Sequence, residues 1–137
     1  MVRDLIMKRL TVLLTMFVML VCVGCESPSD GKKAARERWE KATARMKLDM
    51  ANQEYNSLNF QQSAKAVEQS LHFDPSIPAA HLLNGKLLLA QGQPDKAEFE
   101  LHTALQLNEK LYEAWYWLGV VAQQKKDYEK EIGRAHV

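Results

Sequence analysis

Few side chains in this 137-residue sequence stand at spacings that chemistry uses. Cys22 and Cys25 have the C-x-x-C spacing of redox and metal sites, but both lie in an apolar run where neither role is expected. His72, His81 and His102 lack metal-ligand spacing, and no glycine-rich phosphate loop, G-x-S-x-G or H-E-x-x-H motif occurs. The sequence therefore predicts no enzyme: no catalytic residue, no metal, no cofactor and no small-molecule substrate.

The overall charge excludes another class of partner. Lysine and arginine number 18 against 17 aspartates and glutamates, which gives a formal net charge of +1. Proteins that bind nucleic acid usually carry a strongly basic face, so we expect no nucleic-acid partner. The acidic residues fall mainly on expected helix surfaces or near helix starts, where solvation and the helix dipole account for them.

The N-terminal segment has the sequence pattern of a targeting signal. Arg3, Lys8 and Arg9 precede an uncharged, largely apolar run over positions 10–24, LTVLLTMFVMLVCVG. A membrane-spanning helix needs about 20 apolar residues, whereas a basic segment followed by a shorter apolar core is typical of a secretory signal. We therefore expect a signal peptide over residues 1–24, with a short membrane anchor as the alternative.

The apolar run ends in Val21-Cys22-Val23-Gly24-Cys25, which resembles the lipobox of bacterial lipoproteins. The resemblance implies cleavage after Gly24 and attachment of lipid to the Cys25 sulfur. Cys22 stands where that family usually has leucine, a departure from the pattern. Glu26 after the cysteine implies sorting to the outer membrane, facing the periplasm. An inert thiol is the alternative for Cys25.

A tether and a long helix are expected next. Residues 25–31 are polar with proline and glycine, which predicts a flexible tether. Lys32 to Asn56 contains neither proline nor glycine, which predicts one helix. Spacings of three and four residues predict one apolar stripe along this helix. The expected stripe residues are Ala35, Trp39, Ala42, Met46 and Met50.

The first part of that helix, residues 32–47, is strongly basic. It holds seven basic residues and two acidic ones, a local net charge of +5. Two interpretations stay open. The segment is either a solvated helix face or a basic collar near an anionic membrane surface, where each basic group contributes about 1 kcal/mol.

A repeat organises the remainder of the chain. Gly85 and Gly119 lie 34 residues apart, and so do Ala80 and Ala114. The period divides residues 44–131 into windows 44–77, 78–111 and an incomplete 112–131. It resembles the tetratricopeptide repeat (TPR) family, whose repeat unit has this length. The resemblance implies an all-α helix-turn-helix solenoid, a right-handed superhelix, truncated at its C-terminal end.

The family pattern also assigns packing roles. Gly92 is expected to end one helix and Pro94 to begin the next. His81 stands at an aromatic position of the family, so we expect a packed ring. The expected repeat-packing residues are Gly85, Ala97, Leu101, Ala104, Trp115, Leu118 and Gly119. Trp115, Leu118 and Val121 are expected to lie against a further helix, and to be exposed and drive self-association without one.

Function in this family lies in the concave groove, and the resemblance implies capture of peptide segments there. The expected groove residues are Asn52, Tyr55, Asn56, Lys86, Leu89, Tyr116 and Gln123. The family's inner-groove positions also fall on Leu48, Leu82, Glu113 and Val120. Packing within the superhelix is the alternative role for Leu89 and Tyr116. Asn52 matches one position of the family's carboxylate clamp, but other clamp positions hold Leu48, Leu83, Glu113 and Trp117, so we expect no clamp.

The last six residues, 132–137, read IGRAHV and resemble the translation of a common sequencing adapter, ATC GGA AGA GCA CAC GTC. We expect them to be an artefact and the natural protein to continue past about residue 130. The sequence thus predicts a lipid-anchored TPR adaptor that binds another envelope protein. The alternative is the N-terminal part of a larger enzyme or sensor.

Overall fold

In a computed structural model, the backbone is described over residues 28–135 and the side chains over residues 29–127. The segment expected to be a signal peptide (residues 1–24), Cys25 and residues 136–137 lie outside the described residues. The chain divides into two compact units, residues 1–37 and residues 38–137. The described part of the first unit is the start of one helix, whose side chains over 29–37 are exposed or intermediate.

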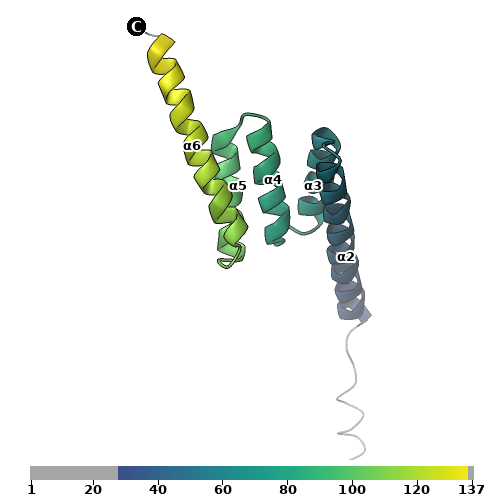
Figure 1. Ribbon diagram of the computed structural model, residues 1–137. Helices are drawn as coiled ribbons and strands as arrows, with labels where there is room; N and C mark the ends of the chain where they lie inside the picture. The colour runs from purple at the N-terminus through teal and green to yellow at the C-terminus, as the bar shows by residue number, and fades with distance from the viewer. Residues whose placement is uncertain (1–27, 136–137) are drawn as a thin grey trace, which may run out of the picture. The chain divides into compact units, whose positions relative to one another are not determined.

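The described residues form five helices (Figure 1). They are α2 (Pro28–Asn56), α3 (Phe60–Phe73), α4 (Pro78–Ala90), α5 (Pro94–Leu107) and α6 (Tyr112–Ala135). Window 78–111 holds α4 and α5, and window 112–131 lies within α6. None of the helices over residues 28–135 is long and apolar enough to cross a membrane.

Local signals account for most helix ends. α4 and α5 each begin with proline in the first turn, where the missing N–H has no intrahelical partner to lose. Gly92, after α4, adopts φ 71°, the left-handed conformation expected of a helix stop. α2 already begins at Pro28, so residues 28–31 of the expected tether are helical. Asp30 in the first turn favours this earlier start, because its charge complements the helix dipole.

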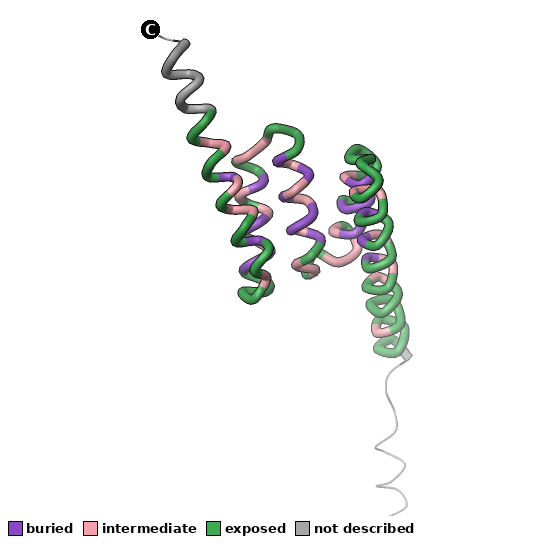
Figure 2. The backbone as a smooth tube through the Cα atoms, viewed as in Figure 1, coloured by how far each residue is buried: buried purple, intermediate pink, exposed green. Residues whose placement is uncertain are grey.

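The core lies along α4, as the buried segments of Figure 2 show. Leu83 and Leu87 pack with residues of α2 and α3, while Leu82 and Leu89 pack with α5 and α6. α4 therefore has no single apolar face; it contributes to two clusters on different sides. A helix that is apolar around its circumference is one that neighbours cover all round.

The apolar stripe expected on α2 does not face the core. Trp39, Met46 and Met50 are 59%, 55% and 46% exposed, and Ala35 and Ala42 are exposed as well. The buried face instead contains Ala44, Leu48 and Ala51.

Two serine hydroxyls show why the smaller residues were buried. Ser70 donates to the Ala44 carbonyl at 2.8 Å, and Ser63 donates to the Ala51 carbonyl at 2.8 Å. Both serines lie on α3 and are fully buried. Such contacts need the α2 and α3 backbones to approach closely, which alanine allows and tryptophan or methionine prevents. Backbone approach, rather than side-chain size, thus decided the packing face.

Candidate functional site

Lys86 of α4 is the centre of a cluster that joins three helices. Its Nζ donates to Glu113 Oε1 of α6 at 3.0 Å. The same ammonium lies 4.8 Å from the ring centroid of Tyr55 on α2 and 5.3 Å from that of Trp117 on α6. We call Tyr55, Lys86, Glu113 and Trp117 the Lys86 cluster. It links the C-terminal half of α2 with α4 and α6.

The electrostatics of the cluster favour the charged forms of both partners. Glu113 also accepts from the indole Nε1–H of Trp117 at 3.4 Å. The hydrogen bond from Lys86 lowers the pKa of the Glu113 carboxyl, against the opposing effect of partial burial. The Lys86 side chain is only 17% exposed, while that of Glu113 is 52% exposed. The anion is therefore the more accessible member of the pair.

The aromatic rings give this site its second property. A cation beside the faces of tyrosine and tryptophan is attracted by the negative ring face, and the contact is worth about 0.5–1 kcal/mol or more as water is excluded. Tyr116 extends the aromatic surface, because its ring lies edge-on to Trp117 with centroids 5.5 Å apart. The cluster thus offers a cation, a carboxylate and several aromatic rings on one surface.

The structure brings together only some of the expected groove residues. Tyr55 and Lys86 meet in the cluster, and Tyr116 lies beside it and is exposed. Leu89 is buried in the core with α5 and α6, so it packs within the repeats. Asn52, Asn56 and Gln123 are exposed, and no hydrogen bond found among the described side chains joins them to the Lys86 cluster.

Asn52 is committed to its own helix. Its Nδ2–H donates to the Leu48 carbonyl at 3.0 Å, one turn earlier in α2. Leu48 and Leu83, at two other positions of the family's clamp, are buried in the core. Glu113, at another, is paired with Lys86. These positions present apolar and acidic groups rather than a set of cations.

One member of the cluster was not among the expected groove residues of the sequence. Glu113 stands at a groove position that the family resemblance implies, whereas Trp117 was noted there only as a residue that displaces a clamp. They are four residues apart, which places them on one face of α6. That spacing could have predicted their contact with each other. Their contact with Lys86, far earlier in the chain, depends on helix packing.

The expected repeat-packing residues divide into two groups. Ala97, Leu101 and Ala104 are fully buried, and Gly85 is buried against Leu101. A Cβ at Gly85 would lie 2.8 Å from Leu101 Cγ and 3.3 Å from the Ala97 carbonyl oxygen. Glycine at this position therefore lets α4 and α5 approach closely.

Trp115 and Gly119 do not pack against the described residues. For Gly119 this corrects the expectation, whereas Trp115 is exposed as expected where no further helix covers it. Trp115 is 57% exposed, and a Cβ at Gly119 would meet nothing within 4 Å. Val121, expected to face a further helix, is instead buried against α5, and Leu118 packs on the same core. The reason is geometric: among the described residues no helix follows α6, so only its sides that face α4 and α5 have partners.

His81 forms a second polar group between elements. Its Nδ1 lies 2.7 Å from Glu100 Oε2 on α5, and its Nε2 lies 2.9 Å from the Pro75 carbonyl. The hydrogen bond to Glu100 raises the pKa of His81, with a smaller opposing effect from burial. Over the residues described, no group of three or more histidine, cysteine or acidic side chains could hold a metal ion.

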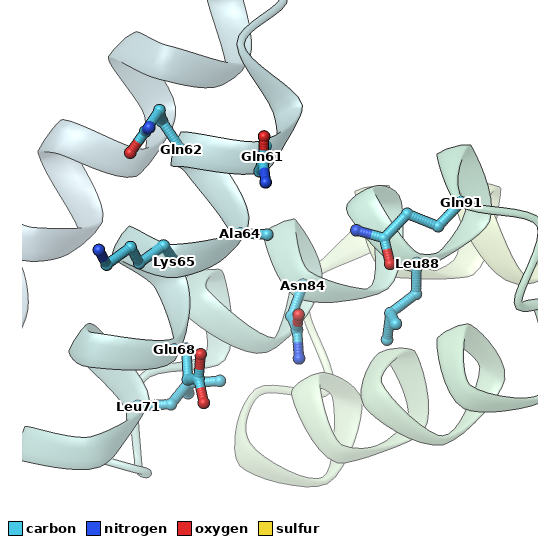
Figure 3. A pocket seen from close by; sticks show the side chains of 9 residues that line it. All are labelled: Gln61, Gln62, Ala64, Lys65, Glu68, Leu71, Asn84, Leu88 and Gln91. Atoms are coloured by element: carbon cyan, nitrogen blue, oxygen red, sulfur yellow. The ribbon is translucent and has the colours of Figure 1, made fainter.

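A separate depression lies away from the Lys86 cluster. It is an open hollow of about 670 Å³ between α3 and α4 (Figure 3). Gln61, Gln62, Lys65, Asn84 and Gln91 supply most of its polar groups. Exposed amides on an open surface satisfy their hydrogen bonds with water, so we place the candidate site at the Lys86 cluster.

Comparison with known proteins agrees with this architecture. The family profile described as tetratricopeptide repeat matches residues 48–101 and again residues 82–136. The chain belongs to the tetratricopeptide repeat family. The two matched segments overlap, as expected when one helical hairpin is shared by successive pairs of repeats. No curated protein matches the chain.

Two solved TPR structures share the fold. One is the first TPR of Spaghetti (RPAP3) bound to the HSP90 peptide SRMEEVD, with a TM-score of 0.60 and 15% identity over 65% of this chain and 71% of that one. The other is the second TPR of the same protein with the same peptide. Its TM-score is 0.54 and its identity 16%, over 70% of this chain and 94% of that one. At these identities the likeness concerns the fold.

Proposed function

We propose that this TPR protein is a lipid-anchored adaptor of the bacterial envelope that binds a peptide segment of another envelope protein at the Lys86 cluster. The observation that carries the proposal is the meeting of Tyr55, Lys86 and Trp117 from three helices. Repeat proteins use such surfaces, built from successive repeats, to hold extended partners. The two similar structures, each solved with a bound peptide, support a peptide as the ligand.

The cluster suggests how a peptide is held. Tyr55, Tyr116 and Trp117 offer ring faces for apolar side chains, since aromatic residues supply much of the energy at protein interfaces. Lys86 offers a cation to a carboxylate or carbonyl oxygen of the peptide. Glu113, the more exposed partner, offers an acceptor to a basic side chain or a backbone N–H. With Leu48 and Leu83 buried, binding does not use the family's C-terminal carboxylate clamp.

In-cell photo-crosslinking tests the peptide site. A photoreactive phenylalanine analogue replaces Tyr116, which is exposed beside the cluster, and in a control chain it replaces Phe99, which is exposed on α5. We expect a discrete crosslinked partner from position 116 and none from position 99.

Substitution of the cluster then defines the contacts. Lys86→Met or Tyr55→Ala, each combined with the probe at position 116, should reduce the crosslink at least about tenfold, the effect of losing roughly 1.4 kcal/mol. Circular dichroism should be unchanged, because both side chains lie at the edge of the core. An undiminished crosslink in both variants would exclude the cluster as the binding site.

The lipid anchor has a separate test. The lipobox-like end of the apolar run supports attachment at Cys25 and an outer-membrane location facing the periplasm. Wild-type chain should incorporate a labelled fatty acid and enter the detergent phase on cloud-point partitioning. Cys25→Ala should lose the label, while Cys22→Ala should keep it. Label retained in Cys25→Ala would refute the anchor and leave the peptide site untouched.

A further inference from the structure

α2 carries an apolar stripe on its solvent side that the core does not use. Trp39, Met46 and Met50 are all about half exposed or more. They are separated by seven and four residues, so they lie along one face of the helix. The Trp39 ring makes an edge-to-face contact with Phe73 of α3, with centroids 5.6 Å apart. The indole is thus held in place while much of its surface stays open.

An open hollow adjoins this stripe. It has a volume of about 530 Å³ and lies between Trp39, Thr43 and Lys47 of α2 and the end of α3. Its α3 side is formed by Glu68, Gln69, His72 and Phe73. Aromatic and methylene surfaces therefore continue from the stripe into a recess that can receive an apolar chain.

Basic residues flank the stripe on both sides. With 3.6 residues per turn, Arg38 and Arg45 fall on one flank together with Asp49, and Lys47 falls on the other flank together with Glu40. Both arginines are exposed. Asp49 is the acidic residue of α2 nearest the stripe, and the wider segment 32–47 has a net charge of +5. Residues 48–131 carry −5, so the positive charge is concentrated at this end of the chain.

We infer that the exposed face of α2 formed by Trp39, Met46 and Met50 docks on the surface of an anionic phospholipid bilayer. A central apolar stripe with basic residues on both flanks matches the layers of that surface. Apolar side chains and the indole enter the interfacial region, while arginine and lysine stay at the level of the phosphates.

The inference is independent of peptide binding at the Lys86 cluster and of lipid on Cys25. Only a short segment separates Trp39 from Cys25 in the sequence, so a lipid there would hold α2 near the bilayer and strengthen docking. The docking itself uses residues of α2 and α3 alone. A test must therefore report where Trp39 lies, rather than whether the whole chain is attached to a membrane.

Lipid quenching of one tryptophan provides that readout. The full chain carrying Trp115→Phe and Trp117→Phe keeps Trp39 as its sole tryptophan and is reconstituted into vesicles with brominated acyl chains. We expect quenching at least about twofold stronger in mixed phosphatidylglycerol–phosphatidylcholine vesicles than in phosphatidylcholine alone. Adding Arg38→Gln and Arg45→Gln should reduce it to the phosphatidylcholine level. A matched chain that keeps only Trp115, also exposed, should be quenched equally in both vesicles.

Each other outcome overturns the inference. Trp39 that is reached by aqueous iodide but not by the brominated lipid marks a solvated helix face. Trp39 protected from both quenchers marks a protein cover, either a second copy of this chain or another partner. If lipid quenching of Trp39 changes neither with phosphatidylglycerol nor with the arginine substitutions, an anionic surface is excluded as the ligand.

Discussion

His81 shows how a single residue couples the pH to the fold. Both of its neighbours, the Glu100 carboxylate and the Pro75 carbonyl, are hydrogen-bond acceptors. Both ring nitrogens must therefore carry a proton to satisfy them, and this requires the imidazolium. The ring packs between α4, α5 and the turn before α4, as an aromatic would, but it adds a charge-assisted bond between them.

Stability should fall as His81 loses its proton. Because its pKa in the folded protein is raised above 6.5, its contribution is fully present below pH 6.5 and is lost as the pH rises through the folded value. We expect about 1.5 kcal/mol less unfolding free energy at pH 9 than at pH 6, the lower end of the range for one hydrogen bond to a charged group. Urea denaturation at both pH values measures it.

His81→Phe is the control for this pH dependence, since it keeps an aromatic ring without the titrating group. Its unfolding free energy should be nearly equal at pH 6 and pH 9. Glu113 and Asp74, whose pKa values are lowered, titrate well below this range and do not contribute to the difference. An equal slope in His81→Phe would assign the effect to another group.

At the scale of the elements, alanine substitutions at Gly85 in α4 and Gly119 in α6 should have opposite effects on stability. A Cβ at Gly85 would lie 2.8 Å from Leu101 Cγ, so Gly85→Ala should separate α4 from α5 and cost about 1–3 kcal/mol. At Gly119 a Cβ meets nothing, so Gly119→Ala should stabilise α6 by roughly 0.5–1 kcal/mol. Denaturant unfolding measures the free energy of unfolding of both variants. A change in the same direction in both would contradict the packing described.

The turns that end α2 and α4 have the same backbone conformation, although their residues differ. Leu58 and Gly92, which stand one repeat period apart, have φ 61° and 71°. In each stop the next N–H bonds a carbonyl five residues earlier: Asn59 to Glu54 at 2.8 Å, and Gln93 to Leu88 at 2.9 Å. This is the Schellman pattern, in which glycine is favoured because a Cβ opposes the left-handed conformation.

Leu58→Gly should therefore stabilise the protein. Leu58 is 75% exposed, so little packing is lost, and relief of the backbone should gain roughly 0.5–1 kcal/mol in unfolding free energy. Leu58→Ala is the matched control, because it removes the side chain but keeps the Cβ. It should gain nothing. Equal gains in the two variants would attribute the effect to the side chain rather than the backbone.

At the scale of the molecule, α6 presents an aromatic face that the core does not cover. Tyr112 and Trp115 are largely exposed, and Gly119 lies open beside them. Exposed apolar patches of this kind promote association. We expect the chain to self-associate with rising concentration, and Trp115→Ser to weaken that association at least about tenfold.

Analytical ultracentrifugation of the Cys25→Ala chain measures this association without an acyl anchor. Phe99→Ser is the control, because Phe99 is also large and exposed but lies on α5. It should leave the association constant unchanged. A monodisperse monomer at high concentration would contradict the prediction.

The sequence determined the fold class and where most helices begin and end. Pro78, Pro94 and Gly92 start or end helices through their own backbone conformations, so their effect can be predicted locally. The repeat period can likewise be detected by comparing the sequence with itself. The tertiary structure alone decided which face of α2 packs, because that depends on how closely α3 can approach Ala44 and Ala51. It likewise assembled the Lys86 cluster from three helices, since no local pattern fixes the distance between side chains on separate elements.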